Sequence, residues 1–422
     1  MGLIFYNFFL FFYVAGIRLA AVYNNKAKQW LKGRKAIFFQ IQQQFAENKN
    51  PVIWMHCSSL GEFEQGRPVL EQLKLHYPSY KILLTFFSPS GYEVQKNYNG
   101  ADFIFYLPMD SYNHAKKFIG ITKPALAIFV KYDFWFYYLK GIYKNKIPLL
   151  LISGVFRKDQ PFFLWYGGLH RRMLGFFQHL FVQDGNSQTL LSGIGVENAT
   201  TAGDTRFDRV SETAKTFIPV AHVQEFCNGS IIIVAGSTWP ADEKKIQLAM
   251  VHLENLKAKL IIAPHEINPD HLNEIKRLFP GCIFYSDLKN GNKSSSSVLV
   301  IDNIGMLSRL YKYATITYVG GGFTKDGIHN VLEAAVFGKP VIFGPNYKKY
   351  REAVELISIG GALNFEDKNG DGKDLAKILQ TFIVNKEMAN EMGKLAGNYI
   401  QQHIGASQKI LNYIQEKRLL TK

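Results

Sequence analysis

Residues 315–345 read TITYVGGGFTKDGIHNVLEAAVFGKPVIFGP, and this stretch predicts a strand, a glycine-rich loop, a helix and a second strand. The glycines that end the first strand allow a ligand to approach the backbone closely. A helix that begins near His329 would point free N–H groups and its positive dipole end at the loop, which suits a phosphate. Glu333, one turn later, could accept hydrogen bonds from both hydroxyls of a ribose. The alternative is a glycine-rich turn followed by a capped helix.

Similar units of strand and helix extend from this stretch toward both ends of the chain. The predicted strands are residues 52–57, 81–87, 103–108, 125–130, 148–153 and 179–184, and then 231–237, 259–265, 297–302, 315–321 and 340–345. Continuous apolar runs of this kind are typical of buried parallel strands. Two such series predict an α/β fold with two Rossmann-like, doubly wound domains that face a cleft. We place the N-terminal domain at residues 35–205 and the C-terminal domain, with the last helices, at 215–422.

The composition is that of a folded globular protein, because 47% of the 422 residues are hydrophobic and 20% are charged. The formal net charge of +15 favours an anionic partner. The basic residues are spread along the chain and form no recognised nucleic-acid-binding motif, so we expect no nucleic-acid partner. The three cysteines lie far apart and form no CxxC pair, so we expect neither a disulfide framework nor a metal site.

Residues 1–25 are predicted to form a membrane anchor. Residues 2–17 carry no charge, and with Arg18 tolerated the apolar stretch approaches the ~20 residues that a bilayer span needs. Five lysines and arginines follow between residues 26 and 35, which places the rest of the chain in the cytoplasm. A signal peptide fits less well, because no positive charge precedes the apolar run. A buried core helix is a further alternative, and the anchor could span the membrane or lie in its interface.

The loop after the first predicted strand also carries chemistry. It reads HCSSLGEFEQGRP (56–68) and places Ser58 and Ser59 just before Glu62. A carboxylate at the mouth of the predicted cleft could take a proton from an acceptor hydroxyl. The alternative is a capping box, in which Ser59 accepts a hydrogen bond from the Glu62 amide and Glu62 reaches back to the N-cap.

Three further motifs could contact an anion or a nucleotide. They are AGSTWPADE (235–243), APHEINPD (263–270) and GDTRFDRV (203–210). The hydroxyls of Ser237 and Thr238 could hold an anion or cap the helix that follows. His265 is either a ligand contact or a surface residue. Arg206, at the junction of the two predicted domains, could face an anion or be solvated.

These motifs, in this order, resemble those of the 3-deoxy-D-manno-octulosonic acid (Kdo) transferases of Gram-negative bacteria. The matching pieces are the hydrophobic N-terminal segment, SSLGE, LPMD (107–110), GDTRFD, AGSTWPADE, APHE and GGGFTKDGIHNVLEAAVFGKPV. The resemblance implies a GT-B glycosyltransferase that takes part in lipopolysaccharide synthesis at the cytoplasmic leaflet of the inner membrane. Its donor would be CMP-Kdo, bound by the C-terminal domain, and its acceptor lipid IVA, bound by the N-terminal domain. Transfer would invert the anomeric centre without a metal or a cofactor.

The resemblance also implies roles for individual residues. Glu62 would be the general base, and Asn330 and Glu333 would lie near the ribose of CMP. The expected donor contacts are Ser237, Thr238, His265, Gly321, Gly322, Gly327, Asn330 and Glu333. The expected acceptor or anion contacts are Ser58, Ser59 and Arg206.

The chain departs from the family pattern at three places. Lys131 stands where many members have an acidic residue, SGVFRKDQ (153–160) replaces an Asn-Ala-Arg-x-Ser-Glu-Arg-Ser pattern, and Ala334 replaces a proline. The first two fall in the acceptor half. Two alternative functions stay open, a GT-B transferase for another nucleotide sugar such as a UDP-hexosamine, and a non-catalytic nucleotide-binding membrane scaffold. The intact Glu62 and glycine loop speak against the scaffold.

Overall fold

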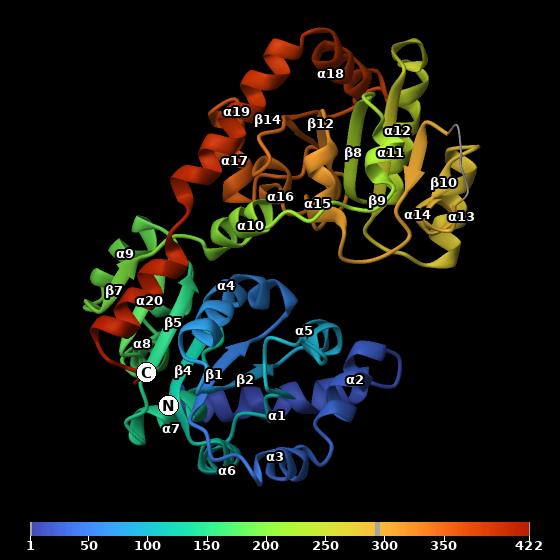
Figure 1. Cartoon of the computed structure of the whole chain (residues 1–422). Coiled ribbons are helices and arrows are strands. Elements are labelled where there is room, and N and C mark those ends of the chain that lie inside the picture. Colours follow the sequence, from blue (N-terminus) through green and yellow to red (C-terminus); the bar gives the residue numbers. More distant parts are fainter. Residues whose placement is uncertain (1, 292–295, 422) are drawn as a thin grey trace. The chain divides into compact units, whose positions relative to one another are not determined.

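The computed structural model describes residues 2–291 and 296–421, and the chain forms two compact units (Figure 1). Unit 1 comprises Met1–Asp208 together with Ile404–Lys422, and unit 2 comprises Arg209–His403. Each unit is built around its own seven-stranded sheet, in which every neighbouring pair of strands is parallel. The predicted α/β class with two doubly wound domains is confirmed.

The sheet of unit 1 has the strand order β3-β2-β1-β4-β5-β6-β7. Its strands are β1 (Val52–Cys57), β2 (Lys81–Phe86), β3 (Phe103–Tyr106), β4 (Pro124–Val130), β5 (Leu149–Gly154), β6 (His179–Val182) and β7 (Ala199–Thr201). The first six match the strands expected from the apolar runs. The seventh was not predicted, because it is a three-residue edge strand with two threonines and no apolar run.

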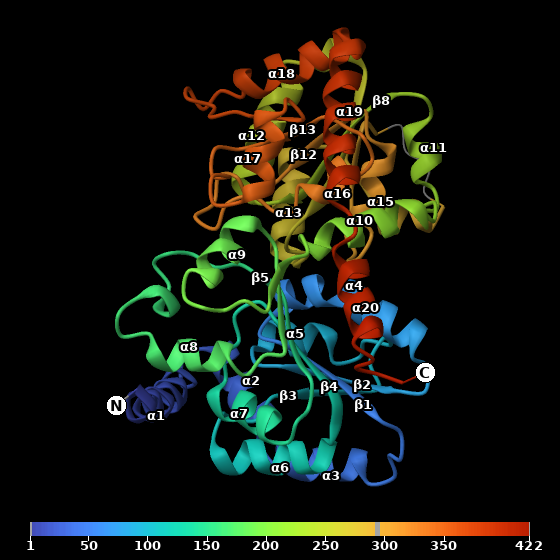
Figure 2. The same cartoon turned by 90° about the vertical axis from the view of Figure 1, so that its left-hand side faces the viewer.

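Helices cover both faces of this sheet. They are α1 (Gly2–Ala20), α2 (Asn25–Gly33), α3 (Ile37–Phe45), α4 (Leu60–His76), α5 (Pro89–Gln95), α6 (Tyr112–Thr122), α7 (Phe136–Lys144), η1 (Pro161–Phe163), α8 (Gly168–Leu174), α9 (Gly185–Ser192), α10 (Thr205–Lys215, which continues into unit 2) and α20 (Ala406–Glu416). Along β1, Val52 and Trp54 pack on the face covered by α3, α6 and α7, and Ile53 and Met55 pack on the face covered by α4 and α20. Figure 2 shows α3 and α6 side by side.

Helix α1 is attached to unit 1 at its N-terminal end. Tyr6 donates a hydrogen bond to Asp110 over 2.6 Å and accepts one from the backbone N–H of Phe136 over 3.2 Å. Asn7 accepts a hydrogen bond from the Tyr137 hydroxyl over 2.8 Å. Much of the rest of the helix is exposed, and it is the one helix, in the described part of the chain, that is long and apolar enough to cross a membrane.

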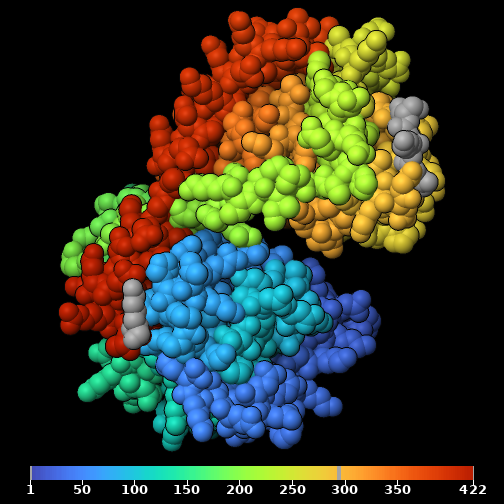
Figure 3. All heavy atoms as spheres, viewed as in Figure 1, coloured from blue at the N-terminus to red at the C-terminus, as the bar shows by residue number. Residues whose placement is uncertain are grey.

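The C-terminal segment belongs to unit 1 and not, as we expected, to the C-terminal domain. Helix α20 buries Ile410, Leu411 and Ile414 in the same cluster as Phe63 of α4. In Figure 3 the red atoms of this segment lie directly against the light blue atoms of α4. The prediction that residues 215–422 form one domain was therefore wrong for residues 404–422. The apolar face of α20 completes the core of the first unit.

The sheet of unit 2 has the strand order β10-β11-β9-β8-β12-β13-β14. Its strands are β8 (Ile231–Thr238), β9 (Ala258–Pro264), β10 (Ile283–Phe284), β11 (Val298–Val300), β12 (Ile316–Val319), β13 (Val341–Phe343) and β14 (Ala362–Asn364). The two edge strands, β10 and β14, were not predicted. Each has only two or three residues, too few to show a pattern.

The helices of unit 2 are α11 (Val223–Cys227), α12 (Pro240–Val251), η2 (Glu254–Leu256), α13 (Pro269–Leu278), α14 (Tyr285–Lys289), α15 (Leu307–Leu310), η3 (Tyr311–Tyr313), α16 (Leu332–Ala335), α17 (Arg351–Ser358), α18 (Lys373–Val384) and α19 (Lys386–His403). Helix α16 corrects the expectation of a helix that begins near His329. It begins three residues later and has four residues, because Asn330 turns the chain by accepting a hydrogen bond from the Leu332 N–H over 3.2 Å.

Candidate active site

The sheet of unit 1 brings two acidic loops together. Strands β1 and β4 are parallel neighbours, so the loops that follow them leave the same edge of the sheet. The first loop leads into α4 and carries Glu62, and the second, Lys131–Trp135, carries Asp133. The negative charge of Asp133 acts on Glu62 closely enough to raise its pKa. Unit 1 therefore has a pair of carboxyl groups where a ligand of such a sheet is expected.

Glu62 lies in the first turn of α4, and its carboxylate accepts a hydrogen bond from the backbone N–H of Ser58. Ser59 is the N-cap residue, but its side chain makes no capping hydrogen bond. The predicted capping box is thus only half formed, since Glu62 reaches back to the backbone while Ser59 leaves the Glu62 amide uncapped. The Ser59 hydroxyl is not used by the helix.

The pKa of Glu62 is raised to about 8, first by burial and then by the negative charge of Asp133. The backbone N–H of Ser58 and the cation of Lys131 act in the opposite direction and lower it. A carboxyl group whose pKa lies near neutral pH can accept a proton from a hydroxyl and release it again. Burial and the charge of Asp133 thus give Glu62 a proton affinity that suits proton transfer near neutral pH.

A buried chain of hydrogen bonds holds Asp133. His56 Nε2 lies 2.8 Å from Asp133 Oδ2, and His56 Nδ1 lies 2.8 Å from Thr85 Oγ1. The indole N–H of Trp54 donates to the same Thr85 oxygen over 2.8 Å. All three contacts are satisfied when the Thr85 hydroxyl donates to Nδ1 of a neutral imidazole and Nε2–H donates to Asp133. His56 and Thr85 are fully buried, so this chain fixes the orientation of the Asp133 carboxylate.

Sequence reasoning missed this chain. His56 and Thr85 are polar residues inside the apolar runs of β1 and β2, and paired residues of the two parallel strands lie side by side. A histidine in a fully buried strand needs a partner. This need for a partner was the one sign of the chain in the sequence. The sequence did not show that the partner would come from the loop after β4.

Two other residues expected at the acceptor are engaged within the protein. Arg206 forms an ion pair with Asp204 over 2.7 Å, and both belong to the GDTRFD motif. Ser58 accepts a hydrogen bond from the Ser88 N–H at its carbonyl over 2.7 Å, while its own N–H binds Glu62. Contact of either residue with an acceptor stays a prediction.

Unit 2 gathers its motifs in the same way. Strands β9, β8 and β12 are consecutive in the sheet, so the segments that follow them converge at one edge. Asp242 of α12 ties two of these segments together, because it accepts hydrogen bonds from the Trp239 N–H over 3.0 Å and the Gly321 N–H over 2.9 Å. The Thr238 hydroxyl is buried and donates to Glu243 over 2.8 Å. The Thr238 hydroxyl therefore supports the loop from inside the protein.

Three aromatic rings stack at this edge. Trp239 lies on His265 with ring centroids 4.8 Å apart, and His265 lies on His329 at 4.3 Å. The Trp239 indole donates to His329 Nε2 over 3.0 Å. Burial, and then the proximity of His265, lower the pKa of His329 to about 4, so its ring is neutral at pH 7 with the proton on Nδ1. His265, one of the expected donor contacts, therefore packs against the glycine loop through its stacking on His329.

The glycine loop packs closely on its own backbone. Gly321 has a φ of +90°, and a Cβ there would lie 2.5 Å from the carbonyl oxygen of Gly327. A Cβ on Gly322 would lie 2.5 Å from the backbone of Gly344. Asn330 donates to Glu333 over 3.1 Å, so these two expected ribose contacts lie together. The Gly321 N–H donates to Asp242, and the His329 N–H donates to the Gly320 carbonyl. The loop therefore has fewer backbone N–H groups left for a phosphate than the sequence suggested.

No group of three or more histidine, cysteine or acidic side chains that could hold a metal ion occurs among residues 2–291 and 296–421.

Comparison with known proteins bears first on the sheet of unit 1. Residues 33–209 match the family model described as 3-deoxy-D-manno-octulosonic-acid transferase (kdotransferase), a span that includes Glu62, His56 and Asp133. Residues 33–209 belong to the Kdo transferase family. A Kdo transferase from Aquifex aeolicus is 28% identical over 364 residues, which cover 84% of this chain and 94% of the relative. A Kdo transferase from Rickettsia bellii is 24% identical over 400 residues and covers 89% of this chain and 91% of its own length.

Solved structures of other proteins share the architecture of this chain. A putative UDP-N-acetylglucosamine 2-epimerase from Listeria monocytogenes superposes with a TM-score of 0.59 at 14% identity, over 88% of this chain and 98% of that one. A UDP-GlcNAc 2-epimerase from Neisseria meningitidis gives a TM-score of 0.58 at 16% identity, over 86% of this chain and 100% of that one. At such identities the likeness shows the fold alone, which is GT-B-like with two parallel α/β sheets.

Proposed function

We propose that this protein transfers Kdo from CMP-Kdo to lipid IVA in lipopolysaccharide synthesis, with Glu62 as general base. The observation that carries the proposal is the position of Glu62, on the first turn of α4 beside Asp133, with a pKa raised to about 8, in a unit that matches the Kdo transferase family over residues 33–209. The two named relatives are both called 3-deoxy-D-manno-octulosonic acid transferase.

In the proposed reaction Glu62 removes the proton from an acceptor hydroxyl. The hydroxyl oxygen then forms a bond to the anomeric carbon of Kdo, the bond from that carbon to the phosphate oxygen breaks, and CMP leaves with the electron pair. Attack from the face opposite to CMP inverts the anomeric centre. Unit 2 binds CMP-Kdo with Ser237, His265, Asn330 and Glu333 around the glycine loop, the buried Thr238 supports that loop, and no metal takes part.

The helix α1 and the basic residues that follow it support a membrane location. An apolar helix with cations just beyond it suits an anionic inner leaflet, and lipid IVA is presented there. We therefore place the catalytic units on the cytoplasmic side of the inner membrane.

Mass spectrometry of lipid IVA incubated with the purified full chain and CMP-Kdo tests the proposal. CMP-Kdo hydrolyses readily, so its synthetase is included, and a reaction without the protein is the control. A mass gain of one or more Kdo units is the expected result. No gain with intact CMP-Kdo, over a range of detergents, would overturn the proposal, and competition by UDP instead of CMP would point to another nucleotide sugar.

A further inference from the structure

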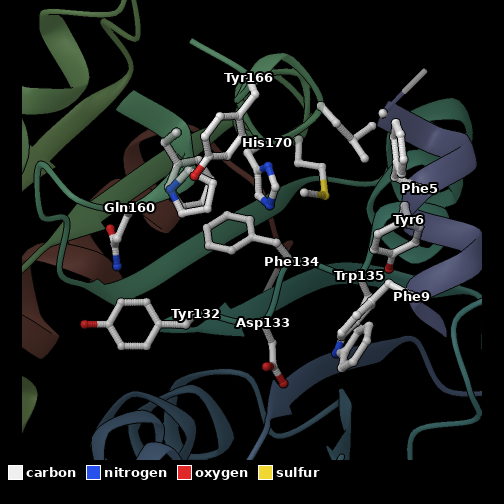
Figure 4. Close-up of a pocket in the computed structure, with 15 residues that line it drawn as sticks. Phe5, Tyr6, Phe9, Tyr132, Asp133, Phe134, Trp135, Gln160, Tyr166 and His170 are labelled. Carbon is white, nitrogen blue, oxygen red and sulfur yellow. The ribbon is translucent and has the colours of Figure 1, made fainter. Parts of the chain in front are cut away.

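A cavity of about 680 Å³ lies in unit 1, between α1, the loop after β4 and the segment from η1 to α8 (Figure 4). Most of its wall is apolar. The side chains that give it this character are Phe5, Phe9, Phe134, Trp135, Leu169 and Met173. An apolar cavity of this size is costly to fill with water, and it suits a hydrocarbon chain.

The polarity of the cavity changes from one end to the other. Phe5 and Phe9 of α1 line one side, Tyr132 and Gln160 lie on the opposite side, and Asp133 lies between them at the lower edge, as Figure 4 shows. The Asp133 carboxylate belongs to this polar part and also acts on Glu62. The cavity thus joins Asp133 of the candidate active site to the apolar helix, and a lipid with a polar head has its groups in the same order.

Helix α1 is a fixed wall of the cavity. The hydrogen bonds of Tyr6 with Asp110 and Phe136 hold its first two turns on unit 1. Much of the remaining surface of the helix is exposed apolar side chain, as expected for contact with lipid. A hydrocarbon chain that enters the cavity therefore moves along α1, from the part that contacts lipid to the part that contacts the protein.

From this arrangement we propose that the cavity binds a fatty acyl chain of the lipid acceptor while the sugar head lies at Glu62 and Asp133. The inference rests on the proposed function and extends it, because α1 becomes part of the acceptor site and not only an attachment to the membrane. The acceptor, and not a bulk phospholipid, is the occupant, since the lining of the cavity includes Asp133, the charged neighbour of the proposed base Glu62.

Two double variants of α1 test this directly. Phe5 and Phe9 line the cavity and are 70% and 57% exposed, while Phe8 and Phe12 do not line it and are 57% and 65% exposed. The cavity variant is Phe5→Ala with Phe9→Ala, and the control is Phe8→Ala with Phe12→Ala. Each removes two exposed phenyl rings from the same helix, so both weaken general membrane contact alike and neither removes a core residue.

Binding is measured on the full chain without CMP-Kdo, by equilibrium dialysis of radiolabelled lipid IVA below its critical micelle concentration. We expect the cavity variant to bind about tenfold more weakly than the control. In the transfer assay KM for lipid IVA rises by a similar factor in the cavity variant alone, and transfer to the deacylated glucosamine disaccharide bisphosphate is the same in both.

The possible results test the cavity proposal and the transferase proposal separately. Equal binding of lipid IVA by the two variants would overturn the cavity proposal and leave the transferase proposal intact. A binding difference without any Kdo transfer by the wild-type chain would support the cavity and overturn the transferase. Displacement of lipid IVA by phosphatidylethanolamine at equal concentration would overturn the acceptor as the specific occupant.

Discussion

At the scale of the residue, two charged neighbours set the proton affinity of Glu62. Asp133 raises its pKa and Lys131 lowers it, while burial contributes the largest increase. Tyr132, Cys57 and Glu64 are further titratable groups in the same neighbourhood. In this chain a cation therefore offsets part of the effect of Asp133.

Glu62→Gln is predicted to lower turnover by about 10²–10⁴-fold while CMP-Kdo binding is retained. It should also stabilise the fold in alkali. The folded pKa of about 8 lies above the unfolded value, so the folded state binds more protons between pH ~4.3 and 8 and the free energy of unfolding falls as pH rises through that window. Glutamine has no charge to bury. The Tm difference between variant and wild type should therefore grow from pH 5 to pH 9, measured by differential scanning calorimetry.

Asp133→Asn and Lys131→Gln should move the pH profile in opposite directions. Activity needs deprotonated Glu62, so it rises with pH through the pKa of this group. Asparagine keeps an acceptor for His56 but removes the charge, so the acid limb of kcat moves to lower pH. Loss of the Lys131 cation moves the limb to higher pH. Steady-state kinetics from pH 5 to 9 checks this, and parallel shifts of the two variants would contradict the assigned electrostatics.

At the scale of the element, the glycine loop depends on the space its glycines leave. Gly321→Ala places a Cβ 2.5 Å from the Gly327 carbonyl oxygen and strains a φ of +90°. Gly281→Ala is the matched control, with a φ of +78° and no atom within 4 Å of the new Cβ. Both pay the left-handed backbone cost of about 1–2 kcal/mol. Only Gly321→Ala should also weaken CMP binding, by about tenfold or more, as measured by isothermal titration calorimetry. Equal affinities of the two variants for CMP would show that the loop does not contact CMP.

The elements were predictable where the sequence repeats a pattern long enough to recognise. Eleven strands follow continuous apolar runs, and all eleven were expected, with β1 at its observed bounds. The edge strands β7, β10 and β14 are too short for any pattern. The late start of α16 coincides with the hydrogen bond from the Leu332 N–H to the Asn330 side chain, which a helical pattern does not reveal.

The candidate site was partly predictable for the same reason. Residues in loops after strands, such as Glu62 and His265, could be recognised locally. The partnership of His56 with Asp133 joins residues 77 positions apart, and it depends on which strands are neighbours in the sheet. Strand order follows from the three-dimensional packing of the helices, so a single sequence gives no direct sign of it.

At the scale of the whole molecule, the chain passes between the units twice. The crossings occur at Asp208–Arg209 and His403–Ile404, and Asp208 joins them by accepting hydrogen bonds from the Gly405 N–H over 2.5 Å and the Ser407 N–H over 2.6 Å. The GDTRFD motif therefore has a structural role at this junction. Its Asp208 fixes the start of α20 on the first unit.

Ile410→Ala is predicted to destabilise unit 1 and not unit 2, by about 2–5 kcal/mol, because its side chain is fully buried in the core shared by α4 and α20. Ile400→Ala, equally buried but on α19, is the reciprocal control in unit 2. Amide hydrogen exchange should show reduced protection of β1 in the first variant and of β12 in the second. Loss of protection in both sheets from either substitution would mean that the units unfold together.

The double crossing has a consequence for synthesis on the ribosome. Unit 2 is one continuous stretch, whereas unit 1 needs residues from both sides of it. The core beneath α4 stays open until Ile404–Lys422 has been translated, after all of unit 2 is complete. The usual order, in which the N-terminal domain closes first, is thereby reversed. The nascent chain exposes α1 and an unfinished apolar sheet face for most of its elongation. Delivery of α1 to a lipid surface during this interval would also shield the chain from aggregation.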